Sequence, residues 1–265
     1  MRLLLVLCSA LAAVGLSVPE GASPGARTPL ASAPQPASSP QPAGERPRAF
    51  YFARAQYAGS HEWRRGAWAT DFPKADRQFI TVAQRLLPTL DIYPADHTVR
   101  FDDPSLRRFP FVYAVEVSYM SLTEPEVAGL RDYLQAGGFL FVDDFWGSAE
   151  WASFEGQIRR VLPDRPIVDL PTDHPVFHTY YDIARIYQVP AIDNICRRGR
   201  TAERDGFEPA VRGIFDAAGR LVVLISWNSD LGDAWEWAEQ PCYPLEFSTY
   251  AFQLGINAIV YAMSR

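Results

Sequence analysis

The feature that most constrains the fold is a helical pattern that leads into a short, continuous apolar run. Thr123–Glu126 (TEPE) has the pattern of a capping box. In this motif the Thr side chain accepts from first-turn amides, and the Glu side chain reaches back to the backbone N–H at the start of the helix. The helical pattern ends at Gly137–Gly138, because a left-handed helix end favours glycine. Phe139–Asp143 (FLFVD) then has the composition of a buried strand. Similar alternation along the chain predicts an α/β fold, with a largely parallel sheet covered by helices.

The remaining pattern supplies the other elements of this sheet. Further strands are predicted at Ala49–Tyr57, Phe111–Val117 and Ile167–Leu170, and further helices from Asp71–Pro73, at Ser148–Val161 and at Leu245–Met263. Val211–Asp216 and Leu221–Trp227, joined by a turn at Ala218–Gly219, predict an antiparallel hairpin at one edge. The residues between about 176 and 204 show no regular period.

The N-terminal 47 residues differ in composition from the rest. Residues 1–17 have a basic start, a short apolar run and a small-residue exit, which is the layout of a secretory signal peptide. An uncleaved N-terminal anchor is the alternative; Cys8 lies inside the apolar run, which argues against a lipid anchor. Residues 18–47, rich in Pro, Ala and Ser, predict a disordered tether. A single folded domain is therefore expected at residues 48–265, exported and periplasmic, with no membrane span in the mature chain.

Charge and cysteine content narrow the classes of partner. The net charge of −6 argues against nucleic acid, which requires a basic face. Cys196 and Cys242 could pair in an oxidising compartment, but nothing in the sequence fixes the distance between them. Neither cysteine has the spacing of a metal site.

Several motifs together resemble a known family. They are Arg54-x-x-Tyr57, the run from Trp68 to Pro73, LRDYLQAGGFLFVDDFWG, DHPVF, GRLVVLISWNSDLGDAWEW and the closing LGINAIVYA. The chain from about Ala49 to Arg265 is similar to the bacterial family called domain of unknown function 4159. This resemblance implies a flavodoxin-like, three-layer sandwich like that of the class I glutamine amidotransferases. It implies no activity.

The chain departs from true amidotransferases at the nucleophile. Their catalytic cysteine lies in a G-x-C-x-G turn directly after a central strand. The corresponding turn here is Asp143–Gly147 (DDFWG), and neither remaining cysteine follows a comparable turn. No G-x-S-x-G motif follows any of the predicted strands either. Amidotransferase and serine hydrolase chemistry are therefore not expected.

Two carboxylates at the end of the third predicted strand are the sharpest candidates for acid–base or metal chemistry. In open parallel sheets, ligands bind beyond the carboxyl ends of the strands, where Asp143 and Asp144 lie. Successive strand residues point to opposite faces, so only one of the two is expected to face the crevice. The alternative is that both stabilise the turn and the next helix.

Residues from other loops could complete such a site. Asp71, Asp76, Asp230 or His174 could pair with one of these carboxylates across the crevice. His174 precedes a proline in a turn, where a purely structural histidine is the alternative. The WNSDLGD segment, with Asn228 and Asp230, partly resembles a calcium loop but lacks its twelve-residue pattern. A turn-rich loop is the alternative there.

Aromatic residues and one arginine extend the candidate ligand site. All seven tryptophans lie at or after predicted strand ends, and Trp68, Trp146 and Trp235, with Tyr57, are expected to contact a sugar or peptide. The alternative is that these rings pack the loops onto the sheet. Arg54 on the first strand requires a carboxylate partner if buried, and such an ion pair would explain nearby acids without catalysis.

Two principal hypotheses of different classes follow from these residues. The first is a ligand-binding or envelope-associated module that holds a glycan, a peptide or an envelope protein in an aromatic and acidic crevice. The second is a metal-assisted hydrolase that uses Asp143 or Asp144, His174 and Asp230. A structural partner in an envelope complex is a further alternative. The sequence identifies no cofactor.

Overall fold

The folded region contains one seven-stranded mixed sheet. A computed structural model describes residues 50–59 and 66–264 of the chain. The strands, in the order in which they lie in the sheet, are β2 (His97–Arg100), β1 (Ala53–Gln56), β3 (Phe111–Ala114), β4 (Phe139–Val142), β7 (Leu221–Trp227), β6 (Ala210–Phe215) and β5 (Ile167–Asp169).

Five of these strands are parallel, and the last two form an antiparallel edge. The parallel part runs β2-β1-β3-β4-β7, which is the flavodoxin-like order 2-1-3-4-5 when the parallel strands are counted along the chain. β6 pairs antiparallel with β7 from Ala210↔Trp227 to Phe215↔Leu221, and β5 pairs antiparallel with β6. The predicted edge hairpin is therefore confirmed. In such a sheet, the strand order reverses between β1 and β3, and ligands bind beyond the carboxyl ends of the strands there.

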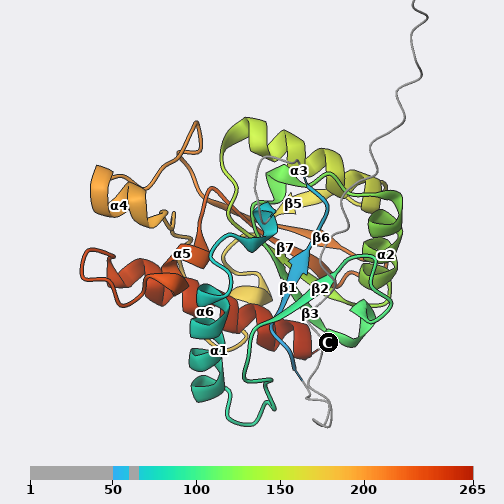
Figure 1. Cartoon of the computed structure of the whole chain (residues 1–265), viewed down its shortest axis with the longest axis horizontal. Coiled ribbons are helices and arrows are strands. Elements are labelled where there is room, and N and C mark those ends of the chain that lie inside the picture. Colours follow the sequence, from blue (N-terminus) through green and yellow to red (C-terminus); the bar gives the residue numbers. More distant parts are fainter. Residues whose placement is uncertain (1–49, 60–65, 265) are drawn as a thin grey trace, which may run out of the picture. The chain divides into compact units, whose positions relative to one another are not determined.

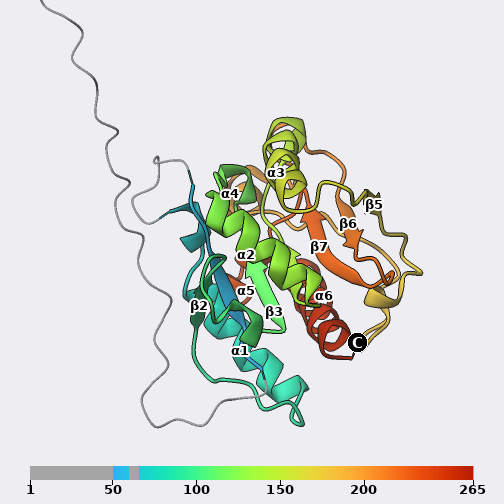
Figure 2. The same ribbon diagram turned by 90° about the vertical axis from the view of Figure 1, so that its right-hand side faces the viewer.

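Helices cover both faces of the sheet. The α-helices are α1 (Lys74–Leu86), α2 (Glu124–Gln135), α3 (Gly147–Val161), α4 (Ile192–Arg198), α5 (Leu231–Glu236) and α6 (Leu245–Met263). The short 3-10 helices are η1 (Ala67–Ala69), η2 (Leu106–Arg108), η3 (Val117–Tyr119) and η4 (Pro175–Phe177). Figures 1 and 2 show α1 and α6 on one face of the sheet and α2 and α3 on the other. The α/β class with three layers agrees with the prediction.

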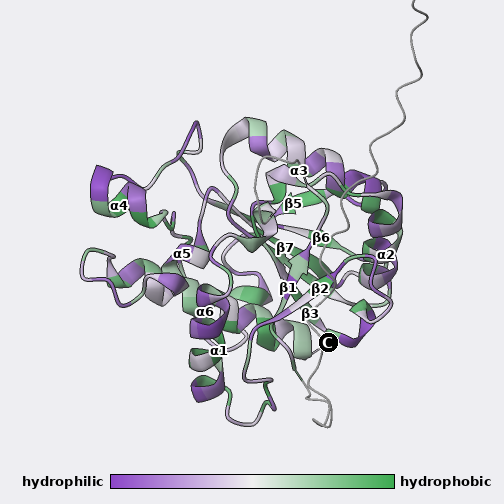
Figure 3. Cartoon of the chain, viewed as in Figure 1, coloured by the Kyte–Doolittle hydropathy of each residue, from purple (hydrophilic) through white to green (hydrophobic). Residues whose placement is uncertain are grey.

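Two hydrophobic clusters, one on each face, form the core. Alternate strand residues such as Phe52, Phe111 and Phe141 pack against α1, α5 and α6. Their neighbours Ala53 and Val112 pack on the other face against α2 and α3. Figure 3 shows hydrophobic residues in the central strands, whereas α4 carries both hydrophilic and hydrophobic residues. Burial of a single such side chain contributes about 1.5–3 kcal/mol, so the two clusters dominate the stability of the domain.

Local sequence signals fixed several boundaries. The capping box of α2 is present: Thr123 N–H donates to Glu126 Oε2 at 2.8 Å, and the Thr123 hydroxyl accepts from Glu126 N–H. The strand predicted at Phe111–Val117 ends at Ala114, because Glu116 adopts a left-handed conformation and a 3-10 turn begins at Val117. β2 was not predicted, since its HTVR sequence lacks an apolar run.

The predicted signal peptide and tether, residues 1–17 and 18–47, lie outside the described residues. Among residues 50–59 and 66–264, no helix combines the length and apolar character needed to cross a membrane.

Candidate functional site

A cavity of about 200 Å³ lies at the carboxyl edge of the parallel sheet. Its lining comes from the segments that follow β1, β3, β4 and β7, together with residues beside α4. The lining residues are Thr70, Asp71, Glu116, Asp144, Trp146, Glu150, Ala191, Glu203, Arg204, Asp230 and Asp233. Seven of these are carboxylates and one is a cation, and we refer to this space as the acidic cavity.

The backbone around the acidic cavity is unusual. Five non-glycine residues in the described part of the chain have a positive φ, and four of them line the cavity: Asp71, Glu116, Asp144 and Arg204. The fifth, Asn228, lies two residues before the cavity residue Asp230. Such conformations cost about 1–3 kcal/mol each and concentrate at functional sites. The concentration of these residues marks this edge of the sheet as a candidate functional region.

Three aspartates from different loops meet at the floor of the cavity. Oxygen atoms of Asp71, Asp144 and Asp230, one from each, all lie within 4.8 Å of one another. We call these residues the floor triad. Asp144 and Asp230 are almost completely buried, with 7% and 4% of their surface exposed.

Few protein donors serve the floor triad. Asp144 Oδ1 accepts one long hydrogen bond, of 3.4 Å, from Trp146 Nε1. Asp230 Oδ1 caps α5 by accepting from Asp233 N–H at 2.8 Å. Asp71 Oδ2 is buried without a hydrogen-bond partner among the described residues. The described residues therefore satisfy the carboxyl oxygens of the floor only in part.

Burial and mutual repulsion act on the floor triad in the same direction. Burial raises the pKa of Asp71 well above its ordinary value, and the charge of Asp233 raises it further. Burial likewise raises the pKa of Asp144, with Glu116 as the next contributor. The pKa of Asp230 is raised by burial and then by Asp144. The charge of Arg54 opposes the shift of Asp71 but does not overcome it.

The rim of the cavity contains its single cation. Arg204 Nη2 lies 2.5 Å from Glu150 Oε1, and Glu150 Oε2 accepts from Trp146 N–H. Glu203 accepts from Asn194 Nδ2 at 2.6 Å. Burial and the charge of Glu150 raise the pKa of Glu116 to about 8. The rim is thus partly neutralised, whereas the floor is not.

A second group of carboxylates shares Asp71 but is compensated. Oxygens of Asp71, Asp233 and Glu236 also lie within 4.8 Å of one another. However, Asp233 accepts from Ile192 N–H and from Trp237 Nε1, at 2.7 and 3.0 Å. Glu236 lies 3.8 Å from Lys74 Nζ. This group already has the donors and the cation that the floor triad lacks.

Asp143 lies behind the floor and outside the cavity lining. Its Oδ2 accepts from the Tyr113 hydroxyl at 2.7 Å and from the backbone N–H groups of Leu231 and Gly232 at 2.8 and 3.2 Å. Burial raises the pKa of Asp143 to about 7, although these donors oppose the shift. Of the two neighbouring aspartates, only Asp144 lines the cavity. Both follow the end of β4, and Asp144 has a left-handed backbone, so regular strand alternation is not the cause.

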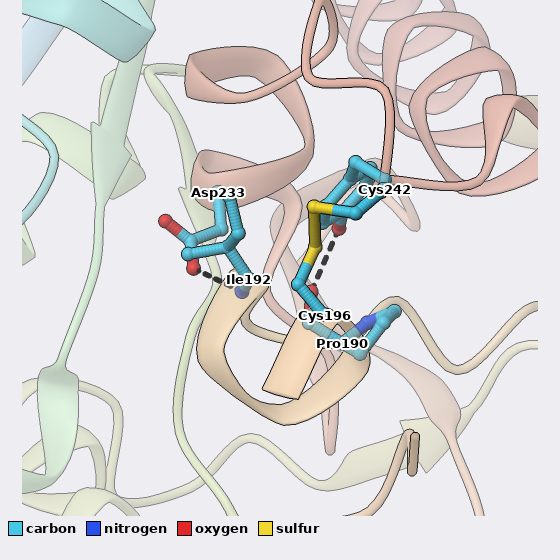
Figure 4. The surroundings of a disulfide bond; sticks show 6 residues. Pro190, Ile192, Cys196, Asp233 and Cys242 are labelled. Atoms are coloured by element: carbon cyan, nitrogen blue, oxygen red, sulfur yellow. Dashed lines mark hydrogen bonds between the residues drawn. A yellow bond between two sulfur atoms is a disulfide. The ribbon is translucent and has the colours of Figure 1, made fainter. Parts of the chain in front are cut away.

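A disulfide braces one wall of the cavity. The wall consists of Ala191, α4 and the segment up to Arg204, and three contacts fasten it to residues at or after α5 (Figure 4). They are the Cys196–Cys242 disulfide with Cα atoms 5.5 Å apart, a hydrogen bond from the Tyr243 hydroxyl to Pro190 O, and a hydrogen bond from Ile192 N–H to Asp233 Oδ2. Cys196 lies in the short helix α4, within the region where the sequence showed no regular period. The sequence left open whether Cys196 and Cys242 pair, and the structure shows that they do.

The structure brings four of the predicted site residues together around the cavity: Asp71, Asp144, Trp146 and Asp230. Arg54 instead forms a buried ion pair with Asp76. The Tyr57 hydroxyl donates to Val115 O and Glu116 O at 2.7 and 2.9 Å, which ties the end of β1 to that of β3.

Three other predicted ligand-binding residues have structural contacts outside the cavity lining. Trp235 is fully buried and packs against Phe79 and Tyr113. Trp68 packs on Phe72. Asn228 Oδ1 accepts from the backbone N–H at the start of α3, at 2.8 Å. For the tryptophans, packing of loops onto the sheet is the better interpretation.

His174 lies at the opposite edge of the sheet. Its ring contacts Phe215 and Tyr261, and its Nδ1 accepts from Val176 N–H at 3.2 Å. Phe215 pairs with Leu221, the first residue of β7, whereas Asp230 follows the last residue of that strand. The proposed grouping of His174 with Asp144 and Asp230 is therefore not formed, because β7 separates them along its length.

Sequence reasoning missed several lining residues. Glu116 lies inside the strand predicted at Phe111–Val117, but β3 ends at Ala114, so the residue falls beyond the carboxyl end of the strand. Glu203 and Arg204 lie in the irregular region and reach the cavity only through the folding of the braced wall. No local pattern marks them.

Comparison with known proteins gives one match. The model of a family described as Domain of unknown function (DUF4159) matches residues 51–263, a span that contains every strand, every helix and every residue that lines the acidic cavity. No curated protein matches the sequence.

Proposed function

The chain belongs to the DUF4159 family, and from the acidic cavity we propose that it is a ligand-binding module whose ligand carries positive charge. The observation that carries this proposal is the composition of the cavity, in which seven carboxylates face a single arginine.

Charge balance supports a cationic ligand. Taking a charged side chain out of water costs several kcal/mol unless an opposite charge or hydrogen-bond donors compensate it. Arg204 pairs with Glu150 at the rim, and Arg54 pairs with Asp76 away from the lining. In the floor triad, Asp144 accepts one long hydrogen bond from Trp146, and Asp230 accepts one ordinary hydrogen bond from Asp233 N–H. A bound cation would supply the missing compensation.

The same geometry favours binding over acid–base hydrolysis. A carboxylate pair that divides acid and base roles needs environments that move the two pKa values apart. Here burial raises the pKa of Asp71, Asp144 and Asp230 together, and His174 lies at the other edge of the sheet. Among the partner classes expected from the sequence, a peptide or envelope component with a basic group fits this cavity better than a neutral glycan.

The proposed setting is the periplasm. The signal-like residues 1–17 and the Pro-rich residues 18–47 support export on a flexible tether. The Cys196–Cys242 disulfide is also typical of an oxidising compartment.

Thermal unfolding of the EDTA-treated full chain tests the proposal. Each small cation, Ca²⁺, Mg²⁺, Mn²⁺ or 1,4-diaminobutane, is added at constant ionic strength. At least one should raise the melting temperature saturably, because a ligand that binds only the native state stabilises it. Asp164→Asn, which changes an exposed acid, serves as the control and should respond like the wild type. A chain that none of the four cations stabilises would contradict the proposed function.

A further inference from the structure

We infer that the floor triad, Asp71, Asp144 and Asp230, is a binding site for one hard divalent cation such as Ca²⁺, Mg²⁺ or Mn²⁺. This inference rests on the proposed function and specifies its ligand, since an organic cation would equally satisfy the charge of the cavity.

The spacing of the triad fits a single ion. One oxygen from each aspartate lies within 4.8 Å of the other two. Two ligands of the same ion can be separated by at most twice the metal–oxygen distance, which is about 4.8 Å for a Ca–O distance of about 2.4 Å. The three oxygens therefore lie close enough to share one ion at the point between them.

An unpartnered oxygen provides an independent indication of a bound cation. Asp144 and Asp230 are more than nine-tenths buried and line the cavity. Asp144 Oδ1 accepts one long hydrogen bond from Trp146 Nε1, and Asp230 Oδ1 accepts from Asp233 N–H. Asp71 Oδ2 is buried and has no hydrogen-bond partner among the described residues. Buried polar atoms are normally satisfied, so the unpartnered Asp71 oxygen, beside two buried carboxyl groups, indicates a partner that the described residues do not supply.

The donor atoms select the class of ion. The triad offers only carboxylate oxygens, and neither His nor Cys occurs among the cavity lining residues. Oxygen donors suit Ca²⁺, Mg²⁺ and Mn²⁺, whereas Zn²⁺ sites are built mainly from His and Cys. Three protein ligands leave further coordination positions open. The cavity of about 200 Å³ has room for several waters at about 30 Å³ each to fill them.

The neighbouring carboxylate group is not expected to hold a second ion. Lys74 already stands beside Glu236, and two N–H donors occupy Asp233. Binding with a stoichiometry of one is therefore expected, and Glu236→Gln should leave it unchanged.

The triad can be tested without disturbing the backbone. Asp71 and Asp144 have φ values of 61° and 55°, a left-handed conformation that asparagine adopts readily. Asp230 is the N-cap of α5, a position where asparagine is as favourable as aspartate. Each Asp→Asn change thus removes one charge and preserves the local structure.

Isothermal titration calorimetry of the EDTA-treated full chain provides the closing experiment. We expect one site for Ca²⁺, Mg²⁺ or Mn²⁺, and an affinity at least about tenfold weaker in Asp144→Asn and in Asp230→Asn, because the number of charged ligands sets the affinity of such sites. Asp164→Asn and Glu236→Gln should bind like the wild type. In the metal-free state, both triad variants should melt at a higher temperature than the wild type, since a repelling buried charge is gone.

The outcomes separate this inference from the proposed function. If 1,4-diaminobutane binds and no metal ion does, the metal site is wrong and the cationic ligand stands. If neither class binds, both fail. Triad variants that melt lower in the metal-free state and bind metal like the wild type would show that the aspartates only support the fold. Two metal sites, with one lost in Glu236→Gln, would overturn the single-ion assignment.

Discussion

Arg54 and Asp76 form a fully buried, two-pronged ion pair between β1 and α1. Arg54 Nε donates to Asp76 Oδ1 at 3.3 Å, and Nη2 donates to Asp76 Oδ2 at 2.5 Å. The third nitrogen, Nη1, donates to Thr70 O at 3.1 Å, the carbonyl that immediately precedes Asp71. Arg54 therefore helps to position the loop that carries Asp71 of the floor triad, while Asp76 balances the positive charge of Arg54.

Asp76→Asn should strongly destabilise the domain. Removing one partner of a buried pair leaves the other charge uncompensated, at a cost of about 3–5 kcal/mol in the free energy of unfolding. Urea unfolding followed by circular dichroism measures the loss. The double variant Arg54→Met/Asp76→Leu serves as the comparison and should recover part of it, because apolar side chains replace the charges. A single variant as stable as the wild type would mean that the pair contributes little.

The metal-free chain should lose stability as pH rises from about 5 to about 8. Burial raises the pKa of Asp143 to about 7 and the pKa of Glu116 to about 8, and it also raises the pKa values of the floor triad. A raised carboxyl pKa stabilises the fold fully below its unfolded value of about 4, and this stabilisation disappears as pH passes the folded value.

The urea midpoint in EDTA at a series of pH values measures this effect. Glu116→Gln should flatten the upper part of the curve, because its amide does not ionise. Since the cost of ionising buried carboxyl groups is the cause, a saturating divalent cation should restore stability at the high end. A midpoint that rises steadily over this range would contradict the assignment of raised pKa values.

The disulfide should stabilise both the domain and the cavity wall. Its cysteines are 46 residues apart in sequence, and closing a loop of that length stabilises by about 4 kcal/mol in the chain-entropy model. Cys196→Ser/Cys242→Ser should lower the free energy of unfolding by that order. Hydrogen exchange should show the greatest loss of protection in α4, with the amides of α2 as the internal reference. Equal loss in both helices would mean that the disulfide does not act locally on the wall.

Local signals predicted most of the sheet but only part of the site. The capping box at Thr123 and the apolar run at Phe139 reveal α2 and β4 because their information lies within a few neighbouring residues. Asp71 and Asp230 lie in segments far apart in the chain, and only the strand order β1-β3-β4-β7 makes them neighbours. From the sequence, Asp71, Asp76, Asp143 and Asp144 were all possible partners of Arg54. In the structure Arg54 points to the same face of the sheet as Phe52, which is the face that α1 covers. Asp76 lies in α1 and is therefore the partner that Arg54 reaches.

Gly232 permits the close approach of Asp71 and offers a test of the floor geometry. A Cβ atom at Gly232 would lie 2.4 Å from Asp71 Oδ2, whereas its next neighbour outside that side chain, the Tyr113 hydroxyl, would be at an ordinary 3.5 Å. Gly232 has no positive φ and lies inside α5, where alanine is normally better than glycine by about 1 kcal/mol. Gly232→Ala should nevertheless destabilise the wild type and weaken cation binding, because Asp71 must move.

The sign of this effect should reverse when the Asp71 side chain is absent. In an Asp71→Gly background, which keeps the left-handed backbone accessible, Gly232→Ala should raise the free energy of unfolding by up to about 1 kcal/mol. A double-mutant cycle in urea measures the coupling between the two positions. Coupling near zero would mean that Asp71 does not lie against α5. Strong coupling of the expected sign would place its carboxylate at the floor of the cavity, where the proposed cation requires it.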